Sequence, residues 1–166
     1  MRKLLRFSVA VVAVVLLLAQ FVRPAKTNPA ADPAAHLTAH ARVPVDVQKV
    51  LERSCYDCHS NQTTWPWYSN VAPASWLVAD DVNHGRRHLN FSTWGSNDAD
   101  QRSGLLKEIC QEVSEGKMPL PIYTVVHKDA EVSSEEAHLV CDWARAEAAR
   151  LPVTAEQGKR QRVRND

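Results

Sequence analysis

The chain has 166 residues, of which 45% are hydrophobic, and a formal net charge of +1. Domains usually comprise about 100 to 200 residues, so this length predicts one small hydrophobic core with tails. Residues 1–26 contain five basic and no acidic residues, which leaves a charge of −4 on the remainder and −7 on residues 27–158. Such an acidic domain argues against nucleic acid as a ligand.

The N-terminus carries a nearly unbroken hydrophobic run from Phe7 to Val22, preceded by Arg2, Lys3 and Arg6. Basic residues followed by an apolar run are typical of an export signal. The run is near the lower limit of about 17 to 25 residues that a bilayer-spanning helix needs, and no good cleavage site follows it. We therefore expect residues 1–23 to be a membrane anchor, with a cleaved signal peptide as the alternative. A buried helix of the soluble fold is disfavoured by the one-sided basic flank.

Residues 24–42 hold three prolines, seven alanines and scattered polar residues without a sustained period. This composition predicts a flexible linker in which His36 and His40 are solvated. The folded domain is expected to span residues 43–152. The last residues, 153–166, are rich in lysine and arginine and are predicted to form a basic disordered tail.

Helical spacing of apolar residues predicts four helices in this domain. The first follows Pro44 and runs into a cysteine motif, and the second runs from the region of Asn70 and Pro73 to Gly85. The third opens at Asn97 or Asp98 and stops at Gly116, and the last begins at a capping box formed by Ser133 and Glu136 and ends before Pro152.

Between these helices we expect an ordered loop over 86–96, with Phe91 and Trp94 turned inward, and a proline-stiffened loop over 117–121. Only Tyr123 to Val126 has any strand character. The predicted fold class is therefore all-α: a small helical bundle that follows an N-terminal hydrophobic helix.

The sequence Cys55-Tyr-Asp-Cys58-His59 is a Cys-x-x-Cys-His motif, the attachment signature of c-type haem. Two thiols three residues apart on a helical turn can reach the two vinyl groups of a porphyrin, and the adjoining histidine then lies beneath the iron. A zinc site would need further ligands at matching spacing, and none follows. A thioredoxin-like pair should follow a strand, whereas a helix is predicted here. We therefore expect one covalently bound haem c, with His59 as an iron ligand, and a small cytochrome-c-like helical bundle around this haem.

Met118 is the only methionine besides the initiator, and it lies in the proline-stiffened loop directly after a helix stop. Methionine and histidine form a recognised axial pair in cytochromes c, so Met118 is the predicted second iron ligand. Methionine can also simply fill a core. The rival ligands are His84, His88 and His127.

Five tryptophans are many for this length. Large planar side chains exclude water from a haem, so the aromatic residues near the motif are predicted to line it, although they could equally fill the core. Arg86, with Arg87, is a candidate to pair with the haem propionates, although adjacent arginines are usually solvated. The predicted lining residues are Trp65, Trp67, Tyr68 and Trp76.

Cys110 and Cys141 lie outside the motif, on the apolar faces of two predicted helices. In an oxidising compartment they are predicted to form a disulfide, provided that their Cα atoms come within about 7 Å. Two buried thiols are the alternative.

Several segments together resemble the bacterial haem-binding domain family of small, membrane-tethered c-type cytochromes, over roughly Gln20 to Ala144. The most specific is the tryptophan-rich turn directly after the motif. The resemblance implies one haem held by Cys55, Cys58 and His59, with Met118 as the distal ligand; the second cysteine pair departs from the family pattern. The matching segments are 20–24, 55–69, 71–77, 85–86, 89–92 and 116–120.

These observations favour a one-electron carrier at the outer face of the bacterial cytoplasmic membrane, facing the periplasm or cell exterior, with an unidentified redox protein as partner. The alternative is a haem peroxidase or a gas or redox sensor in which the sixth ligand is open or displaceable, and His88 or His127 acts as an acid-base group. A zinc-holding interaction module at the Cys-x-x-Cys-His motif is a weaker third hypothesis.

Overall fold

The structure is a computed structural model that describes residues 1–152, so the predicted basic tail lies outside the described residues. Within these residues the chain has eight α-helices, four 3-10 helices and no strand, which confirms that the fold is all-α. The α-helices are α1 (Arg2–Ala19), α2 (Leu37–His40), α3 (Val45–Ser54), α4 (Tyr56–His59), α5 (Ala74–His88), α6 (Ala99–Ser114), α7 (Pro121–Val126) and α8 (Ser134–Arg150). The 3-10 helices are η1 (Pro33–Ala35), η2 (Trp67–Asn70), η3 (Phe91–Ser96) and η4 (Lys128–Ala130).

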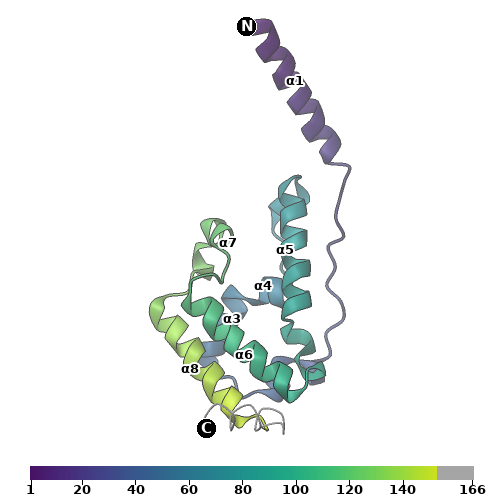
Figure 1. The fold of residues 1–166 in the computed structure, drawn as a ribbon. Coiled ribbons are helices and arrows are strands. Elements are labelled where there is room, and N and C mark those ends of the chain that lie inside the picture. Colours follow the sequence, from purple (N-terminus) through teal and green to yellow (C-terminus); the bar gives the residue numbers. More distant parts are fainter. Residues whose placement is uncertain (153–166) are drawn as a thin grey trace, which may run out of the picture.

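The two long helices α6 and α8 lie side by side and form the largest helix–helix contact of the domain (Figure 1). Both begin at complete capping boxes, Asp98 with Gln101 and Ser133 with Glu136, which satisfy the first free N–H groups of each helix. Helix α3 packs against α8, and the single turn of α4 contacts both α3 and α5. The short helix that carries Cys58 and His59 thus connects α5 with α3, which packs on α8.

The hydrophobic core lies between α3, α6, α8 and the segment around η3. Phe91 and Trp94 are each 1% exposed, as the sequence predicted, and Trp143 is 5% exposed. The indole N–H of Trp143 donates to the carbonyl of Arg42 at 3.0 Å, which satisfies the one polar atom of a buried side chain.

Three predicted element boundaries are corrected. Helix α5 does not end at Gly85 but continues to His88, which shortens the expected loop over 86–96, and η3 occupies most of what remains. The segment 123–126 is not a strand but most of α7, because Pro121 starts a helical turn there.

The segment expected to be a flexible linker, residues 24–42, is instead packed onto the domain. It contains η1 and α2, and Leu37 is fully buried in the core. His40 is exposed, as expected, although its Nε2 is hydrogen-bonded to the carbonyl of Ala34 at 2.9 Å and its ring lies close to Gly95. The folded unit therefore begins before the predicted boundary at residue 43.

Helix α1 projects from the rest of the chain, and none of its residues is buried (Figure 1). Within residues 1–152, no helix combines the length and the apolar character that crossing a membrane requires. The expected long apolar N-terminal helix is thus not found, because α1 has 18 residues and its first turns contain Arg2, Lys3 and Arg6.

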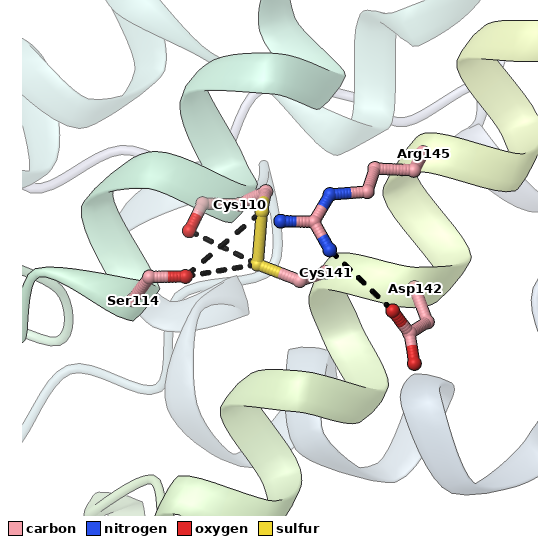
Figure 2. Close-up of a disulfide and its surroundings, with 5 residues drawn as sticks. All are labelled: Cys110, Ser114, Cys141, Asp142 and Arg145. Atoms are coloured by element: carbon pink, nitrogen blue, oxygen red, sulfur yellow. Dashed lines mark hydrogen bonds and ion pairs between the residues drawn. A yellow bond between two sulfur atoms is a disulfide. The ribbon is translucent and has the colours of Figure 1, made fainter.

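A disulfide joins Cys110 of α6 to Cys141 of α8, with their Cα atoms 4.5 Å apart, which confirms the predicted bridge. Figure 2 shows the disulfide between the two helices and the hydroxyl of Ser114 beside it. This hydroxyl is hydrogen-bonded to the Cys141 sulfur, at an O–S distance of 3.0 Å. The bridge closes a segment of 31 residues and therefore restricts the unfolded chain. It fixes α6 against α8 along one side of the core.

Replacing Cys110 and Cys141 together by alanine should lower the free energy of unfolding by about 3 to 4 kcal/mol, because a loop of this size loses its cross-link in the unfolded state. Denaturant titration with and without a thiol reductant measures this. The reductant should destabilise the wild type to the level of the double variant and leave the variant unchanged. Equal stability of all four samples would contradict a stabilising role of the bridge.

Helix α5 approaches α4 so closely that Gly85 has no room for a side chain. A Cβ at this position would lie 2.7 Å from the carbonyl oxygen of Cys58. Contacts this short are not tolerated between a Cβ and backbone atoms, so one of the two helices would have to move. Glycine at position 85 is what permits this packing.

Gly85→Ala should therefore lower the free energy of unfolding by about 1 to 3 kcal/mol. Gly104→Ala is the matched control, because Gly104 lies inside α6 and a Cβ there would have no neighbour within 4 Å. The control should gain about 1 kcal/mol from the higher helix propensity of alanine. Thermal or denaturant unfolding of both variants decides this, and a Gly85→Ala protein as stable as Gly104→Ala would refute the packing argument.

Candidate functional site

The Cys-x-x-Cys-His motif forms one helical turn at a break between two helices. Helix α3 ends at Ser54, and Cys55 is both its C-cap and the N-cap of α4. The N–H of His59 donates to the carbonyl of Cys55 at 2.9 Å, and that of Cys58 donates to the same carbonyl at 3.2 Å. This turn holds both thiols and the imidazole of His59 at one end of α3.

The imidazole of His59 is fixed by a hydrogen bond to the backbone of the segment after α5. Its Nδ1 lies 3.0 Å from the carbonyl oxygen of Leu89, which can only accept, so the proton sits on Nδ1 and the lone pair on Nε2. Burial lowers the pKa of His59, chiefly by desolvation, and so favours the neutral ring. A histidine that donates one ring N–H to a backbone carbonyl and is neutral at the other nitrogen is the usual arrangement of a metal ligand.

Two adjoining cavities meet at His59 and Met118. Their volumes are about 310 and 410 Å³, and five residues line both of them. The first contains Cys55 and the second Cys58, so the structure brings the two thiols, His59 and Met118 around one continuous cleft. The shared residues are Ser54, His59, His88, Met118 and Pro119.

Apolar side chains of α6 and of the segment after α5 form the wall of the first cavity. They are Leu89, Phe91, Leu105, Ile109 and Val113. Leu105, Ile109 and Val113 recur at a spacing of four residues, so they share one face of α6. The spacing of these residues predicts a helix, but it does not indicate that they line a site.

Met118 is placed by the turn that ends α6. Gly116 adopts φ = 66°, a left-handed conformation that glycine reaches without strain. The N–H groups of Lys117 and Met118 then both donate to the carbonyl of Glu112, at 2.9 and 3.1 Å. The reversal of the chain turns Met118 and Pro119 toward both cavities.

The predicted aromatic lining is not what surrounds these cavities. Trp67 is 78% exposed, and Trp76 is 40% exposed with its indole N–H donating to the carbonyl of Val22. Trp65 is partly buried, but it lines neither cavity. Tyr68 lines a smaller neighbouring pocket beside Cys58. Aliphatic residues of α6 take the place that the sequence assigned to tryptophans.

Arg86 faces a different set of groups from the one we expected. Its guanidinium donates to the carbonyl oxygens of Ser60 and Thr27, the side-chain oxygen of Asn28 and the hydroxyl of Thr63, all within 2.9 Å. These four hydrogen bonds thus hold the segment around Thr27 and Asn28 against the loop after the motif. Neither cavity contains an arginine or a lysine among its lining residues.

The three rival histidines occupy different positions. His88 lines both cavities and contacts Glu108 through Nε2 at 3.0 Å, whereas His84 lines only the second and pairs with Asp80. His127 lines neither; its Nε2 lies 2.7 Å from the hydroxyl of Tyr68. Among the histidines, only His59 and His88 share both cavities with Met118.

Both motif thiols are free in the structure. Burial raises the pKa of Cys55 to about 12 and that of Cys58 to about 11, mainly through desolvation of the thiolates. Redox-active Cys-x-x-Cys pairs have lowered pKa values instead, so this environment argues against thioredoxin-like chemistry. Within residues 1–152, the structure has no group of three or more His, Cys, Asp and Glu side chains that could hold a metal ion.

Comparison with known proteins agrees with this geometry. The model of a haem-binding domain family matches residues 14–146, which is most of the chain. No curated protein and no solved structure matched the chain. Because the match includes the motif, the wall of α6 and the Met118 loop, the chain belongs to the haem-binding domain family.

Proposed function

We propose that this haem-binding protein is a monohaem c-type cytochrome that transfers single electrons. The observation that carries the proposal is the convergence of both motif thiols, His59 and Met118 on one cleft. Bound haem would supply an iron that cycles between the ferric and ferrous states. The remaining chemistry is the chain's own: attaching the group, orienting two axial ligands and keeping water away.

Cys55 lines the first cavity and Cys58 the second, and His59 lines both, so the two thiols could reach separate vinyl groups of one haem. The two thiols would hold the haem covalently, each as a thioether to one vinyl group. His59 would bind iron through Nε2, because Nδ1 is engaged with Leu89. The thioether of Met118 would be the second protein ligand of the iron.

The apolar wall of α6 supports electron transfer at this site. It excludes water from one side of the cleft, which lowers the local dielectric and favours the less charged ferrous state. With two protein ligands, the iron would have no open position at which a substrate could bind. An electron carrier is therefore the function that these residues favour.

His88 gives a second candidate function, a peroxidase or gas sensor with an open sixth position. It lines both cavities and contacts Glu108, which could orient it as an acid-base group beside a displaced Met118. Carbon monoxide separates the two functions, because it binds readily only where the sixth position is open. A high-spin spectrum that shifts with carbon monoxide would favour this second function.

We further propose that the domain works on the outer face of the bacterial cytoplasmic membrane. The disulfide between α6 and α8 supports an oxidising compartment, and the basic, then apolar, sequence of α1 supports export. The partner would be another redox protein that meets the exposed edge of the cleft. The acidic charge of residues 27–158 again argues against nucleic acid.

Full-length protein produced with the c-haem maturation machinery should carry one haem that remains bound after denaturation. Replacing Cys55 and Cys58 together by alanine should abolish this attachment, because no thioether can form. The matched control is the double alanine variant of Cys110 and Cys141, which removes the other cysteine pair and should retain the haem. Intact mass and haem staining of denatured protein measure the result, and a wild type with the mass of the bare polypeptide would refute the proposal.

Met118→Ala should remove the weak far-red absorption band of sulfur ligation and lower the reduction potential, because the thioether stabilises ferrous iron. It should also make the iron reactive toward carbon monoxide. Redox titration and absorption spectra of wild type and variant test this. An unchanged spectrum and potential would exclude Met118 as a ligand and point to His88 or an open site.

A further inference from the structure

Four polar side chains beside the motif form a cluster, which we call the latch. Tyr123 donates its hydroxyl proton to Asp57 Oδ2 at 3.0 Å, and a hydrogen bond joins Tyr68 Oη to His127 Nε2 at 2.7 Å. The rings of Tyr123 and His127 are stacked, with centroids 4.3 Å apart and an interplanar angle of 15°. The latch residues are Asp57, Tyr68, Tyr123 and His127.

The latch joins two parts of the chain that both contribute to the second cavity. Asp57 is the residue before Cys58 in the attachment motif, and Tyr68 lies in η2, shortly after it. Tyr123 and His127 belong to α7 and its C-cap, in the segment that follows Met118. Each of the two hydrogen bonds therefore connects the motif region to the Met118 segment.

Helix α7 has little else to hold it in place. None of its residues is buried, and Ile122, Val125 and Val126 are each more than 60% exposed. The segment is anchored at Lys117 and Met118 by the backbone bonds to Glu112, and after α7 by Ala130, which is 1% exposed. Between these two anchors, the latch supplies the side-chain contacts that tie α7 to the motif.

We propose that the latch positions Met118 over the cleft, with Tyr123 and Tyr68 as positioning residues for axial ligation. The inference rests on the proposed function, in which Met118 binds the iron. Leu120 and Tyr123 line the second cavity together with Met118, so a movement of α7 would move that wall of the cleft. An intact latch would keep the thioether near the iron and close the sixth position.

The chemistry of the latch suits a contact that stays formed. Burial and the nearby carboxylate of Asp57 raise the pKa of Tyr123, and burial raises that of Tyr68. Both phenols therefore keep their protons and can donate. The bond from Tyr123 ends on a carboxylate, and hydrogen bonds to charged acceptors are the stronger kind.

Tyr123→Phe and Tyr68→Phe remove one hydroxyl each and preserve the rings. Thr124→Val is the matched control, because Thr124 lies on the same helix and its hydroxyl bonds only locally, to the carbonyl of Pro121 at 3.0 Å. All variants are made in the full-length holoprotein. The readouts are the far-red sulfur band, the affinity for carbon monoxide, and amide hydrogen exchange in residues 117–127.

If the latch positions Met118, Tyr123→Phe should raise the affinity for carbon monoxide about tenfold, because the open state becomes more populated. Tyr68→Phe should raise it roughly threefold, and exchange in residues 117–127 should accelerate by similar factors. Thr124→Val should behave like the wild type. Thermal unfolding of each holoprotein distinguishes these local effects from a general loss of stability, which would accelerate exchange throughout the domain.

Unchanged carbon monoxide affinity and unchanged exchange in both tyrosine variants, beside a wild type with a normal sulfur band, would overturn the latch alone. A wild type that lacks the sulfur band and has the same spectrum as Met118→Ala would overturn the proposed ligand, and with it this inference. Accelerated exchange throughout the domain, rather than within residues 117–127, would reduce the latch to a general structural contact and also overturn the proposal.

Discussion

The close packing of α4 against α5 at Gly85 is the constraint on which the rest of the site depends. Because nothing larger than hydrogen separates α5 from the carbonyl of Cys58, the end of α5 lies beside the motif turn. The backbone that follows α5 then presents the carbonyl of Leu89 to His59 Nδ1. One steric requirement thus determines the orientation of the proposed iron ligand, its tautomer and the nitrogen left free for metal.

The two sides of the cleft come from different parts of the chain and are connected in different ways. The motif side is held by helix packing, whereas the Met118 side depends on the end of α6 and on the latch. The disulfide fixes α6 on α8 and so stabilises the wall formed by Leu105, Ile109 and Val113. The apolar wall is thus cross-linked to α8, whereas the Met118 segment is held by backbone bonds to Glu112 and by the two hydrogen bonds of the latch.

Local chemistry made much of this fold predictable from the sequence. The capping boxes at Asp98 and Ser133, the glycine stop at Gly116 and the motif turn act within a few residues, so their outcome hardly depends on the rest of the chain. The cysteine bridge was predictable because both cysteines lie on the apolar faces of helices. The end of α5 was not, because the packing that retains Gly85 inside a helix is a tertiary contact.

The positions of the tryptophans and of Arg86 depend on which surfaces of the helices and loops pack together. The spacing of apolar residues in the sequence does not reveal this. Trp67 was expected at the haem because it lies near the motif in sequence, yet it is mostly exposed. The segment before the domain looked like a flexible linker because of its proline and alanine content. It forms hydrogen bonds to residues distant in sequence, such as the bond from Asn28 to the carbonyl of Thr63. Amino-acid composition does not predict such bonds.

Arg86 shows how a charge can be accommodated without an anionic partner. Desolvation lowers its pKa, so the half-buried guanidinium has lost part of its hydration. Four oxygen acceptors replace the lost water, and each charge-assisted bond contributes about 1.5 to 3 kcal/mol before that loss is subtracted. A lysine has three donors on one atom and could not reach acceptors on both segments in this planar arrangement. Arginine at position 86 therefore makes the segment around Thr27 and Asn28 part of the folded domain, and it orders the loop that follows the attachment motif.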